Sequence, residues 1–138
     1  PVPTGLTFEE AAAVPQSGAM AMQGLRGPRR VGADRRVLIN GAGGGVGTFA
    51  IQIAKAFGGH VTAVDAAGKA PMMTRLGADR VIDYRAQDYA ATDPYDLILD
   101  AECHRPVHEP RAALAPDGIY ALVGGSSGAA SRAAALAR

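Results

Sequence analysis

Glycines gather in residues 41–47, between a short apolar run and a longer segment whose apolar residues recur at helical spacing. Ala42, Gly44 and Gly47 fall on the three positions of the G-x-G-x-x-G pattern, with alanine in place of the first glycine. Such a turn needs small residues because the strand passes sharply into the helix and because backbone N–H groups must reach a diphosphate. Together with Gly45 and Val46, these residues predict a cradle for the diphosphate of a dinucleotide.

An acidic residue stands where such a cofactor presents a ribose. Asp65 closes the apolar run 60–64, about 20 residues after the glycines, where a carboxylate accepts a hydrogen bond from a ribose 2′-hydroxyl. The alternative is a glycine-rich turn that binds nothing. A phosphate loop of the nucleoside-triphosphate type is excluded, because that motif requires Lys after its last glycine and Thr48 follows Gly47 here.

The composition is that of one globular domain. The chain has 138 residues, of which 48% are hydrophobic and 20% charged, and this is enough to bury a core. A net charge of +1, with basic residues scattered outside the stretch 26–36, gives no reason to expect a nucleic-acid partner. The single cysteine, Cys103, suits a reducing compartment. No apolar run could cross a bilayer and no leader opens the chain, so we expect a cytoplasmic protein with no membrane partner.

Strand-like and helix-like runs alternate after residue 35. Short apolar runs predict strands at 37–40, 61–64, 80–82, 97–99 and 119–123, and helical spacing predicts helices at 46–57, 70–76 and 107–114. Alternation with wholly apolar strands is typical of a parallel sheet whose two faces are both covered. We therefore predict an α/β fold: a Rossmann-type doubly wound parallel sheet with helices on both faces.

Two helices are expected before the first strand. Thr7 and Glu10 match a capping box that begins a helix at Phe8, and Pro15 is placed to begin a second helix, which Gly27-Pro28 ends. The predicted organisation is therefore a helical lead-in over residues 1–35, a dinucleotide-binding core over 36–125, and a truncated C-terminal helix or tail over 126–138.

Several motifs, taken in order, resemble those of one known family. They are Phe8-Glu-Glu-Ala-Ala-Ala-Val-Pro15, the glycine turn 37–47, Leu76-Gly-Ala-Asp79 with Val81-Ile-Asp-Tyr84, Tyr95-Asp-Leu-Ile-Leu-Asp100, and Leu114-Ala-Pro-Asp-Gly118 leading to Val123-Gly-Gly125. Nearly the whole chain resembles the cofactor domain of the medium-chain dehydrogenase/reductase superfamily. Within it, the chain is most similar to the quinone oxidoreductase-like branch, also called zinc-binding dehydrogenases.

The resemblance implies a larger protein than this chain. Members carry an N-terminal GroES-like domain that shapes the substrate cleft, and this chain begins where that domain ends. It therefore resembles a truncated cofactor-binding half, which we expect to be inactive or incomplete alone. The last strand of the sheet often pairs across a two-fold axis in members, so a homodimer is an open alternative to a monomer.

Cofactor choice depends on residues with opposing effects. Asp65 repels a 2′-phosphate and favours NAD. Lys69 and Tyr84 match positions that grip that phosphate in members of the branch, and Ala42 is common where NADP is used. The resemblance thus slightly favours NADP(H) over NAD(H). Lys69 and Tyr84 are equally compatible with ordinary surface roles.

The nicotinamide side is less well marked. Gly124 and Gly125 match backbone that approaches the nicotinamide in members of the family, although they also suit a plain turn after a strand. Met20 stands where a threonine often contacts the nicotinamide, and Met22 where an aromatic residue often follows. Methionines at these positions are equally compatible with core packing.

Zinc is not expected, despite the name of the branch. The position of a zinc ligand in members that use the metal corresponds to Gln16, and no Cys, His, Asp or Glu occurs between residues 14 and 25. Glu102, Cys103, His104 and His108 form an apparent cluster without a second paired motif, so we interpret them as ordinary structural residues. Glu102 and Cys103 replace a Val-Gly pair that borders the nicotinamide in members, which would bring a charge near the ring.

The resemblance implies the cofactor domain of a zinc-free NAD(P)H-dependent oxidoreductase acting on quinones, enones or related carbonyl compounds. No catalytic acid or base is assigned within this chain. One alternative is a stand-alone dinucleotide-binding module or sensor without catalysis. A Rossmann-type methyltransferase is disfavoured, because its cofactor carries no diphosphate for residues 44–47 to bind.

Overall fold

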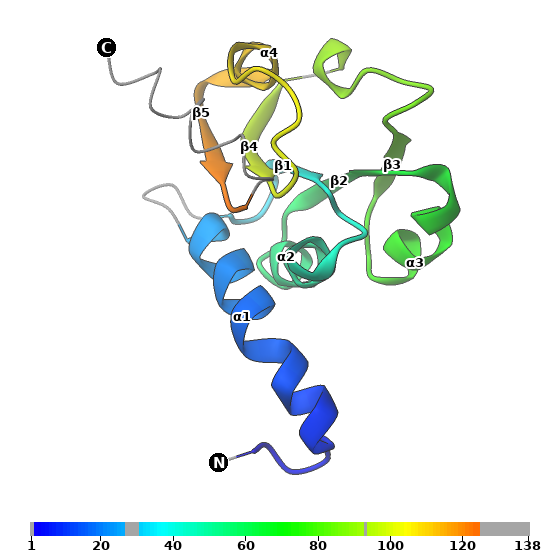
Figure 1. Ribbon diagram of the computed structural model, residues 1–138. Coiled ribbons are helices and arrows are strands. Elements are labelled where there is room, and N and C mark those ends of the chain that lie inside the picture. The colour runs from blue at the N-terminus through cyan, green and yellow to red at the C-terminus, as the bar shows by residue number, and fades with distance from the viewer. Residues whose placement is uncertain (1, 27–30, 93, 125–138) are drawn as a thin grey trace.

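The computed structural model describes residues 2–26, 31–92 and 94–124. Within these ranges five parallel strands form one sheet in the order β3-β2-β1-β4-β5 (Figure 1). In chain order the elements are α1 (Phe8–Leu25), β1 (Arg36–Asn40), α2 (Gly45–Ala56), β2 (His60–Asp65), the 3-10 helix η1 (Ala67–Lys69), α3 (Ala70–Arg75), β3 (Arg80–Asp83), the 3-10 helix η2 (Tyr89–Ala91), β4 (Tyr95–Asp100), α4 (His108–Ala112) and β5 (Leu114–Leu122).

Both faces of the sheet are buried. Successive side chains of a strand point to opposite faces, and Val37 and Ile39 of β1 accordingly belong to one core, while Leu38 belongs to another. The first core also contains buried residues of α1, α2 and α3: Leu25, Ile51 and Met73. The second contains residues from η2 and from the segment after α4: Tyr89 and Ala113. The predicted doubly wound parallel sheet is confirmed.

Polar residues end four of the strands at the same edge of the sheet. The last residues of β1, β2, β3 and β4 are Asn40, Asp65, Asp83 and Asp100. Asn40 pairs in register with Asp100, and Asp65 with Asp83. The strand order reverses between β1 and β4, and ligands of open α/β sheets bind outside the carboxyl ends at such a switch point.

The expectation of two N-terminal helices is wrong. The capping box is present, with Glu10 N–H donating to Thr7 Oγ1 and Thr7 N–H to Glu10 Oε2, but one helix runs through Pro15 to Leu25. Proline removes one backbone donor from a helix, and the alanines and methionines on either side are strong helix formers that carry α1 past the missing bond.

The region around α4 also differs from expectation. The helix predicted over 107–114 is a single turn, because β5 starts at Leu114 rather than at Ile119. The pairing of β5 with β4 shifts register between Tyr95 and Leu97, where Pro116, Asp117 and Gly118 interrupt the ladder. Proline and a bulge are tolerated here because β5 is an edge strand of the described sheet. The predicted tail over 126–138 lies outside the described residues.

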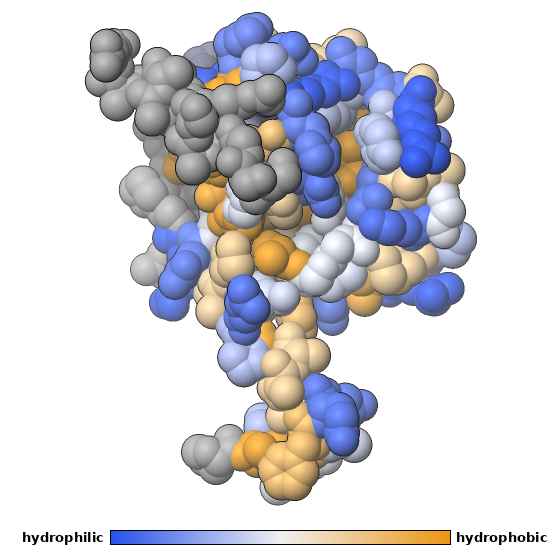
Figure 2. Space-filling model, viewed as in Figure 1, coloured by the Kyte–Doolittle hydropathy of each residue, from blue (hydrophilic) through white to orange (hydrophobic). Residues whose placement is uncertain are grey.

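Helix α1 is docked by its C-terminal half. Gly24 and Leu25 are buried, whereas Phe8, near the start, is 81% exposed. The N-terminal half extends away from the sheet, and its far end carries apolar surface (Figures 1 and 2). No helix among the described residues combines the length and apolarity needed to span a membrane.

Candidate functional site

The turn between β1 and α2 is fixed by hydrogen bonds to the neighbouring strand. The N–H groups of Gly41 and Ala42 donate to the Val64 carbonyl at 3.0 and 3.1 Å, and Gly44 N–H donates back to the Gly41 carbonyl at 3.0 Å. Gly41 has a φ of +78°, in the left-handed region that favours glycine. The turn is therefore rigid before any ligand arrives.

Gly47 allows the helix to lie against this turn. A Cβ at Gly47 would stand 2.2 Å from the Gly41 carbonyl oxygen and 2.5 Å from Ala42 Cα, so no larger residue fits without moving backbone. Ala42 and Gly47 are both buried. Their small size serves the packing of α2 on the end of β1, which is one of the reasons the glycine pattern exists.

The first turn of α2 presents its backbone to solvent. Gly45 is exposed and Gly44 and Val46 are half-buried. Gly44 is the N-cap residue, and no side chain of the described residues caps the helix there. Unpaired N–H groups and the helix dipole together favour an anion at such a terminus. A Cβ at Gly44 would meet only the Gly41 carbonyl oxygen, at 3.3 Å.

Asp65 lies beside this turn and accepts hydrogen bonds on both carboxylate oxygens. Gly43 N–H donates to Oδ2 at 2.8 Å and Ala66 N–H to Oδ1 at 2.7 Å. Burial alone would raise the pKa of Asp65, but the hydrogen bonds from Ala66, Lys69 and Gly43 outweigh burial and hold that pKa below its ordinary value. The carboxylate is therefore ionised and tied to the glycine turn.

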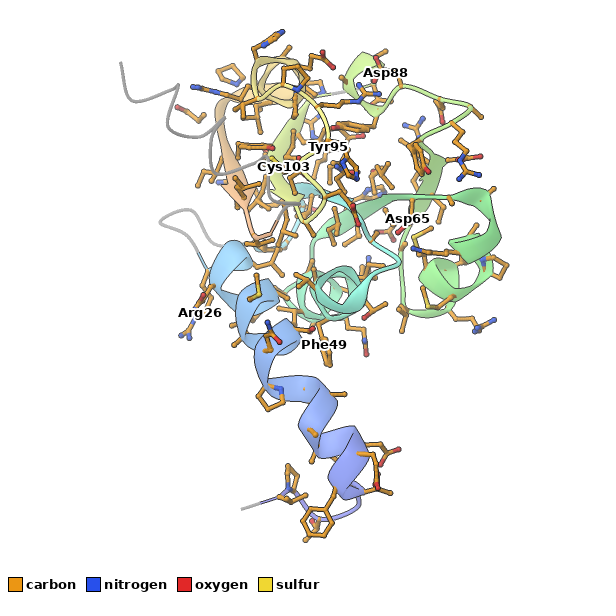
Figure 3. The ribbon with its side chains drawn as sticks, viewed as in Figure 1. Arg26, Phe49, Asp65, Asp88, Tyr95 and Cys103 are labelled. Carbon is orange, nitrogen blue, oxygen red and sulfur yellow. The ribbon has the colours of Figure 1, made fainter. Side chains whose placement is uncertain are left out.

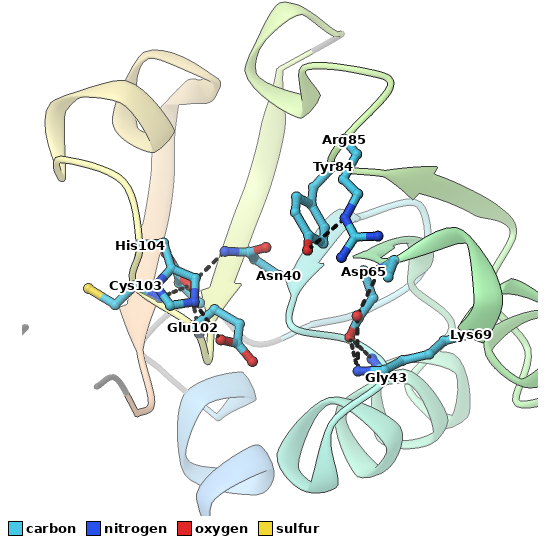
Figure 4. A network of polar contacts seen from close by, with 11 residues as sticks. Asn40, Gly43, Asp65, Lys69, Tyr84, Arg85, Glu102, Cys103 and His104 are labelled. Atoms are coloured by element: carbon cyan, nitrogen blue, oxygen red, sulfur yellow. Dashed lines mark hydrogen bonds and ion pairs between the residues drawn. The ribbon is translucent and has the colours of Figure 1, made fainter. Parts of the chain in front are cut away.

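Lys69 pairs with Asp65, so two residues with opposing expected effects on cofactor choice form one unit. Lys69 Nζ lies 3.0 Å from Oδ1 and 3.1 Å from Oδ2, and its side chain remains 47% exposed (Figure 4). Its ammonium partly neutralises the carboxylate that would repel a 2′-phosphate. The exposed ammonium still has donors to offer a ligand.

A pocket of about 440 Å³ opens at the carboxyl ends of the strands. Its lining contains Asp65 and Lys69 together with the following residues from four strand ends and the loops after them: Asn40, Gly41, Val64, Ala66, Tyr84, Arg85, Tyr89, Glu102, His104 and Arg105. Tyr84 is 48% exposed, and Arg85 Nε donates to its hydroxyl at 3.2 Å. The lining combines the cations Lys69, Arg85 and Arg105 with the carboxylates of Asp65 and Glu102. A phosphate group would find its attractive partners here in Arg85 and the partly exposed Lys69 ammonium.

Sequence reasoning missed Arg85, Tyr89 and Arg105. The Arg105 guanidinium lies 4.6 Å from the centre of the Tyr89 ring and is fixed by Asp88 at 2.7 Å. The Tyr89 hydroxyl is buried without a hydrogen-bond partner among the described residues, and burial raises the pKa of Tyr89 to about 12. A signal for Arg85 existed, because it follows Tyr84 just after β3. Tyr89 opens the short 3-10 helix η2 and Arg105 lies in the loop before α4, and neither residue belongs to a pattern that would mark it in the sequence.

The opposite side of the pocket is formed by the segment after β4. Asp65 and Cys103 lie on separate sides of the end of β1 in Figures 3 and 4. Glu102 leans over the glycine turn, since a Cβ at Gly41 would stand 2.6 Å from Glu102 Cγ. His104 Nε2 lies 2.9 Å from Glu102 Oε2. The Glu102 side chain therefore lies over the glycine turn, between the Asp65 side of the pocket and the segment after β4.

The remaining residues predicted from sequence are spread around this edge. Gly124, two residues after β5, has a φ of +150°, and a Cβ there would stand 3.0 Å from the Ala101 carbonyl oxygen. Gly125 lies outside the described residues. Gln16 is exposed on α1 and Met20 is half-buried. Met22 lines a second pocket, of about 400 Å³, with Leu25, Arg26, Val31 and Phe57.

No metal-binding group is visible in the described ranges. Nowhere in them do three or more His, Cys, Asp or Glu side chains come together as a metal would require. Glu102 and His104 are adjacent, but Cys103 is buried with a φ of +52° and His108 begins α4. Whether the protein uses zinc stays a prediction.

Comparison with known proteins decides the family. The model of the family described as zinc-binding dehydrogenase matches residues 45–137. The chain belongs to this family. The match begins at the first residue of α2, so it includes the helix that the glycine turn opens, together with Asp65 and Lys69.

Two relatives of this chain are named as an oxidoreductase and a reductase. The mitochondrial NAD(P)H oxidoreductase RTN4IP1 of Bos taurus is 41% identical over 109 residues, which are 71% of this chain and 27% of that protein. A trans-enoyl reductase, pgmF, of Aspergillus terreus is 40% identical over 103 residues, 72% of this chain and 29% of that protein. The chain thus spans between a quarter and a third of the length of these relatives.

A protein of known structure shares the fold of this chain. Escherichia coli quinone oxidoreductase, solved in complex with NADPH, superposes with a TM-score of 0.82 and 29% identity, over 93% of this chain and 42% of that one. The predicted family is confirmed, and the chain corresponds to the dinucleotide-binding region of relatives that are named as NAD(P)H and quinone oxidoreductases. The comparisons do not favour the alternative of a stand-alone module.

Proposed function

We propose that this chain binds a nicotinamide dinucleotide across the switch point between β1 and β4 and serves a zinc-free reductase of quinones, enones or related carbonyl compounds. The observation that carries the proposal is the joint arrangement of an uncapped α2 terminus and Asp65, linked by the hydrogen bond from Gly43. The relatives' activities on NAD(P)H, enoyl and quinone compounds support the reaction class.

Each part of the site has one task in this proposal. The backbone N–H groups of Gly45 and Val46 bind the diphosphate, Gly44 leaves room for its approach, and Ala42 and Gly47 keep the turn and helix close together. Gly124 borders the nicotinamide. The bound cofactor supplies the hydride, and the chain's own residues bind and orient it.

The proposed cofactor is NADP(H), ahead of NAD(H). Lys69 neutralises Asp65 at 3.0 Å and keeps a partly exposed ammonium beside the pocket. Tyr84 and Arg85 stand next to it on the same rim. A 2′-phosphate would find two cationic groups and one hydroxyl here, and charge-assisted hydrogen bonds of this kind are strong.

The wider organisation is proposed as expected from sequence. Residues 1–35 lead into a dinucleotide-binding core over 36–125, and residues 126–138 follow this core in the sequence. A cytoplasmic location stays a prediction, since one relative is named as mitochondrial. A homodimer through β5, an edge strand of the described sheet, also stays a prediction; light scattering after size-exclusion chromatography tests it.

Titration of the chain with NADPH and with NADH, followed by calorimetry, tests the proposed function. We expect dissociation constants in the micromolar range. Gly44→Ala should weaken binding about tenfold, because its methyl group occupies space that the diphosphate needs for close approach to the backbone. The melting temperature should change little, because the new Cβ meets only the Gly41 carbonyl oxygen, at 3.3 Å.

Gly47→Val is the matched control at the same turn. Its side chain collides with backbone at 2.2 and 2.5 Å, so it should lower both the melting temperature and the affinity. Absence of saturable binding by the unaltered chain, or equal affinities for the unaltered chain and Gly44→Ala, would contradict the assignment of the diphosphate site.

A further inference from the structure

We propose that Asp100 is a positioning residue: its carboxylate holds the segment 101–104 in a strained backbone conformation that places Glu102 and His104 on the dinucleotide cleft. The proposal rests on the proposed function for the identity of the cleft's ligand. The conformational part can be tested without any ligand.

Asp100 is fully buried and accepts four hydrogen bonds. Oδ1 accepts from Asn40 Nδ2 at 2.9 Å, from Glu102 N–H at 3.0 Å and from Cys103 N–H at 2.8 Å. Oδ2 accepts from the Tyr120 hydroxyl at 2.7 Å. One carboxylate therefore joins the ends of β1 and β4, the strand β5, and the loop that follows β4.

The loop needs such a restraint because of Cys103. Its φ of +52° lies in the left-handed region, which a non-glycine residue enters at a free-energy cost. The two N–H groups that Asp100 accepts from belong to Cys103 and to the residue before it. The carboxylate thus fixes the two peptide units on either side of Glu102, the second of which leads directly into this strained position.

The conformation has a direct consequence at the cleft. Glu102 is turned over Gly41, where a Cβ would stand 2.6 Å from Glu102 Cγ, and His104 pairs with Glu102 at 2.9 Å. Both residues line the pocket, as does Asn40, the third donor to Asp100 Oδ1. Loss of the carboxylate would free this wall of the cleft while leaving the Asp65 side unchanged.

A purely structural role for Asp100, as a tie between strands, makes a different prediction. If Asp100 only linked the strands, its loss would lower the stability of the whole sheet and would not selectively change the conformation of residues 101–104. The single thiol separates the two roles, since Cys103 is only 4% exposed and sits within the held segment.

The first experiment measures the rate at which the Cys103 thiol reacts with an aromatic disulfide in the ligand-free protein. The Asp100→Asn side chain has the same shape as aspartate, but it offers one acceptor oxygen instead of two. We expect its thiolate rate constant, corrected for ionisation by a pH profile, to rise about tenfold or more, as loss of a charge-assisted hydrogen bond to the segment implies. A rate equal to that of the unaltered protein overturns the proposal.

Asp79→Asn is the matched control. Asp79 accepts from Val61 N–H at 2.7 Å and from Lys55 at 2.9 Å, before β3 at the opposite edge of the sheet. This variant should lower the melting temperature without accelerating the thiol reaction in the folded protein. An acceleration as large as that of Asp100→Asn would mean that general loosening causes both, and would also overturn the proposal.

The second experiment is rescue by glycine. Glycine adopts a φ near +50° without strain, so in a Cys103→Gly background the segment should keep its place when the carboxylate is weakened. We expect Asp100→Asn to weaken NADPH affinity about tenfold alone and about threefold or less in that background. Equal losses in both backgrounds contradict positioning through residue 103. If the unaltered chain binds no dinucleotide, the proposed function fails, while the thiol rates still decide the role of Asp100.

Discussion

At the scale of single residues, the Asp65–Lys69 pair changes how cofactor choice should be understood. Taken separately, the two side chains favour different cofactors. In the folded chain the carboxylate already accepts from Gly43, Ala66 and Lys69, so a ribose hydroxyl or a phosphate meets a nearly neutral unit with free donors on its ammonium. The preference for NADP(H) or NAD(H) should therefore change in a direction that depends on whether Asp65 or Lys69 is removed.

Substituting Lys69 and substituting Asp65 should shift the ratio of NADPH affinity to NADH affinity in opposite directions. Lys69→Ala leaves an uncompensated carboxylate and should lower the ratio about tenfold, whereas Asp65→Ser frees the ammonium and should raise it several-fold. Parallel titrations of both cofactors measure this. Lys55→Ala, which removes a lysine paired with Asp79 at 2.9 Å far from the pocket, should leave the ratio unchanged. An unmoved ratio in both test variants would show that neither residue contacts the 2′ position.

Acid should destabilise the chain in part through Asp79. Burial alone would raise its pKa, but hydrogen bonds from Lys55 and Val61 hold the pKa below its ordinary value. Because the folded pKa is the lower one, the ionised form stabilises the fold above the ordinary aspartate pKa of about 3.9, and this contribution is lost as pH falls through the folded pKa. Urea unfolding at pH 7 and pH 3 should show a smaller acid effect for Asp79→Asn than for the unaltered chain; equal effects would exclude this carboxylate.

Sequence reasoning reached the residues of the turn but not their interactions. Gly47 and Asp65 were identified because spacing along one strand, turn and helix is local information. The pairing of Asp65 with Lys69 depends on the short helix η1 that follows β2. The hydrogen bond from Tyr120 on β5 to Asp100 joins two residues of neighbouring strands that lie 20 positions apart in the sequence. Contacts of this second kind arise from packing of distant segments, which periodicity does not report.

At the scale of elements, apolar runs predict each of the five strands of the described sheet, while helix ends are predicted less well. Strands buried on both faces leave an unambiguous apolar signal. A proline inside α1 and the early start of β5 were misjudged for a common reason: each breaks a local rule at an exposed half-helix or a sheet edge, where the surroundings tolerate the exception.

The docking of α1 by its C-terminal half can be tested with two truncations on one helix. Leu25→Ala removes a fully buried side chain from the core and should lower the free energy of unfolding by about 2–5 kcal/mol. Phe8→Ala removes a side chain that is 81% exposed and should change it by less than about 0.5 kcal/mol. Chemical denaturation measures both. A large effect at Phe8 would mean that this end of α1 is covered in solution.

At the scale of the whole molecule, the described pocket is open to solvent at its rim. The lysine and histidine on its rim are 47% and 69% exposed, and hydride transfer is favoured when closure excludes water and orients the acceptor. We therefore predict that residues 1–138 alone bind NADPH yet reduce ortho- or para-quinones no faster than free NADPH does. Steady-state assays of the isolated chain measure this, and saturable turnover at enzyme-like rates would refute it.

The pocket and the Lys55–Asp79 ion pair lie at opposite edges of the parallel sheet. The carboxyl edge carries the pocket, while the amino edge carries the Lys55–Asp79 pair and the hydrogen bond from Val61 to Asp79. Protein engineering can use this separation. Stabilising substitutions, fluorescent labels or surface attachment placed along the amino edge would leave the ligand side unobstructed, and a chain immobilised there would serve as an oriented dinucleotide sensor.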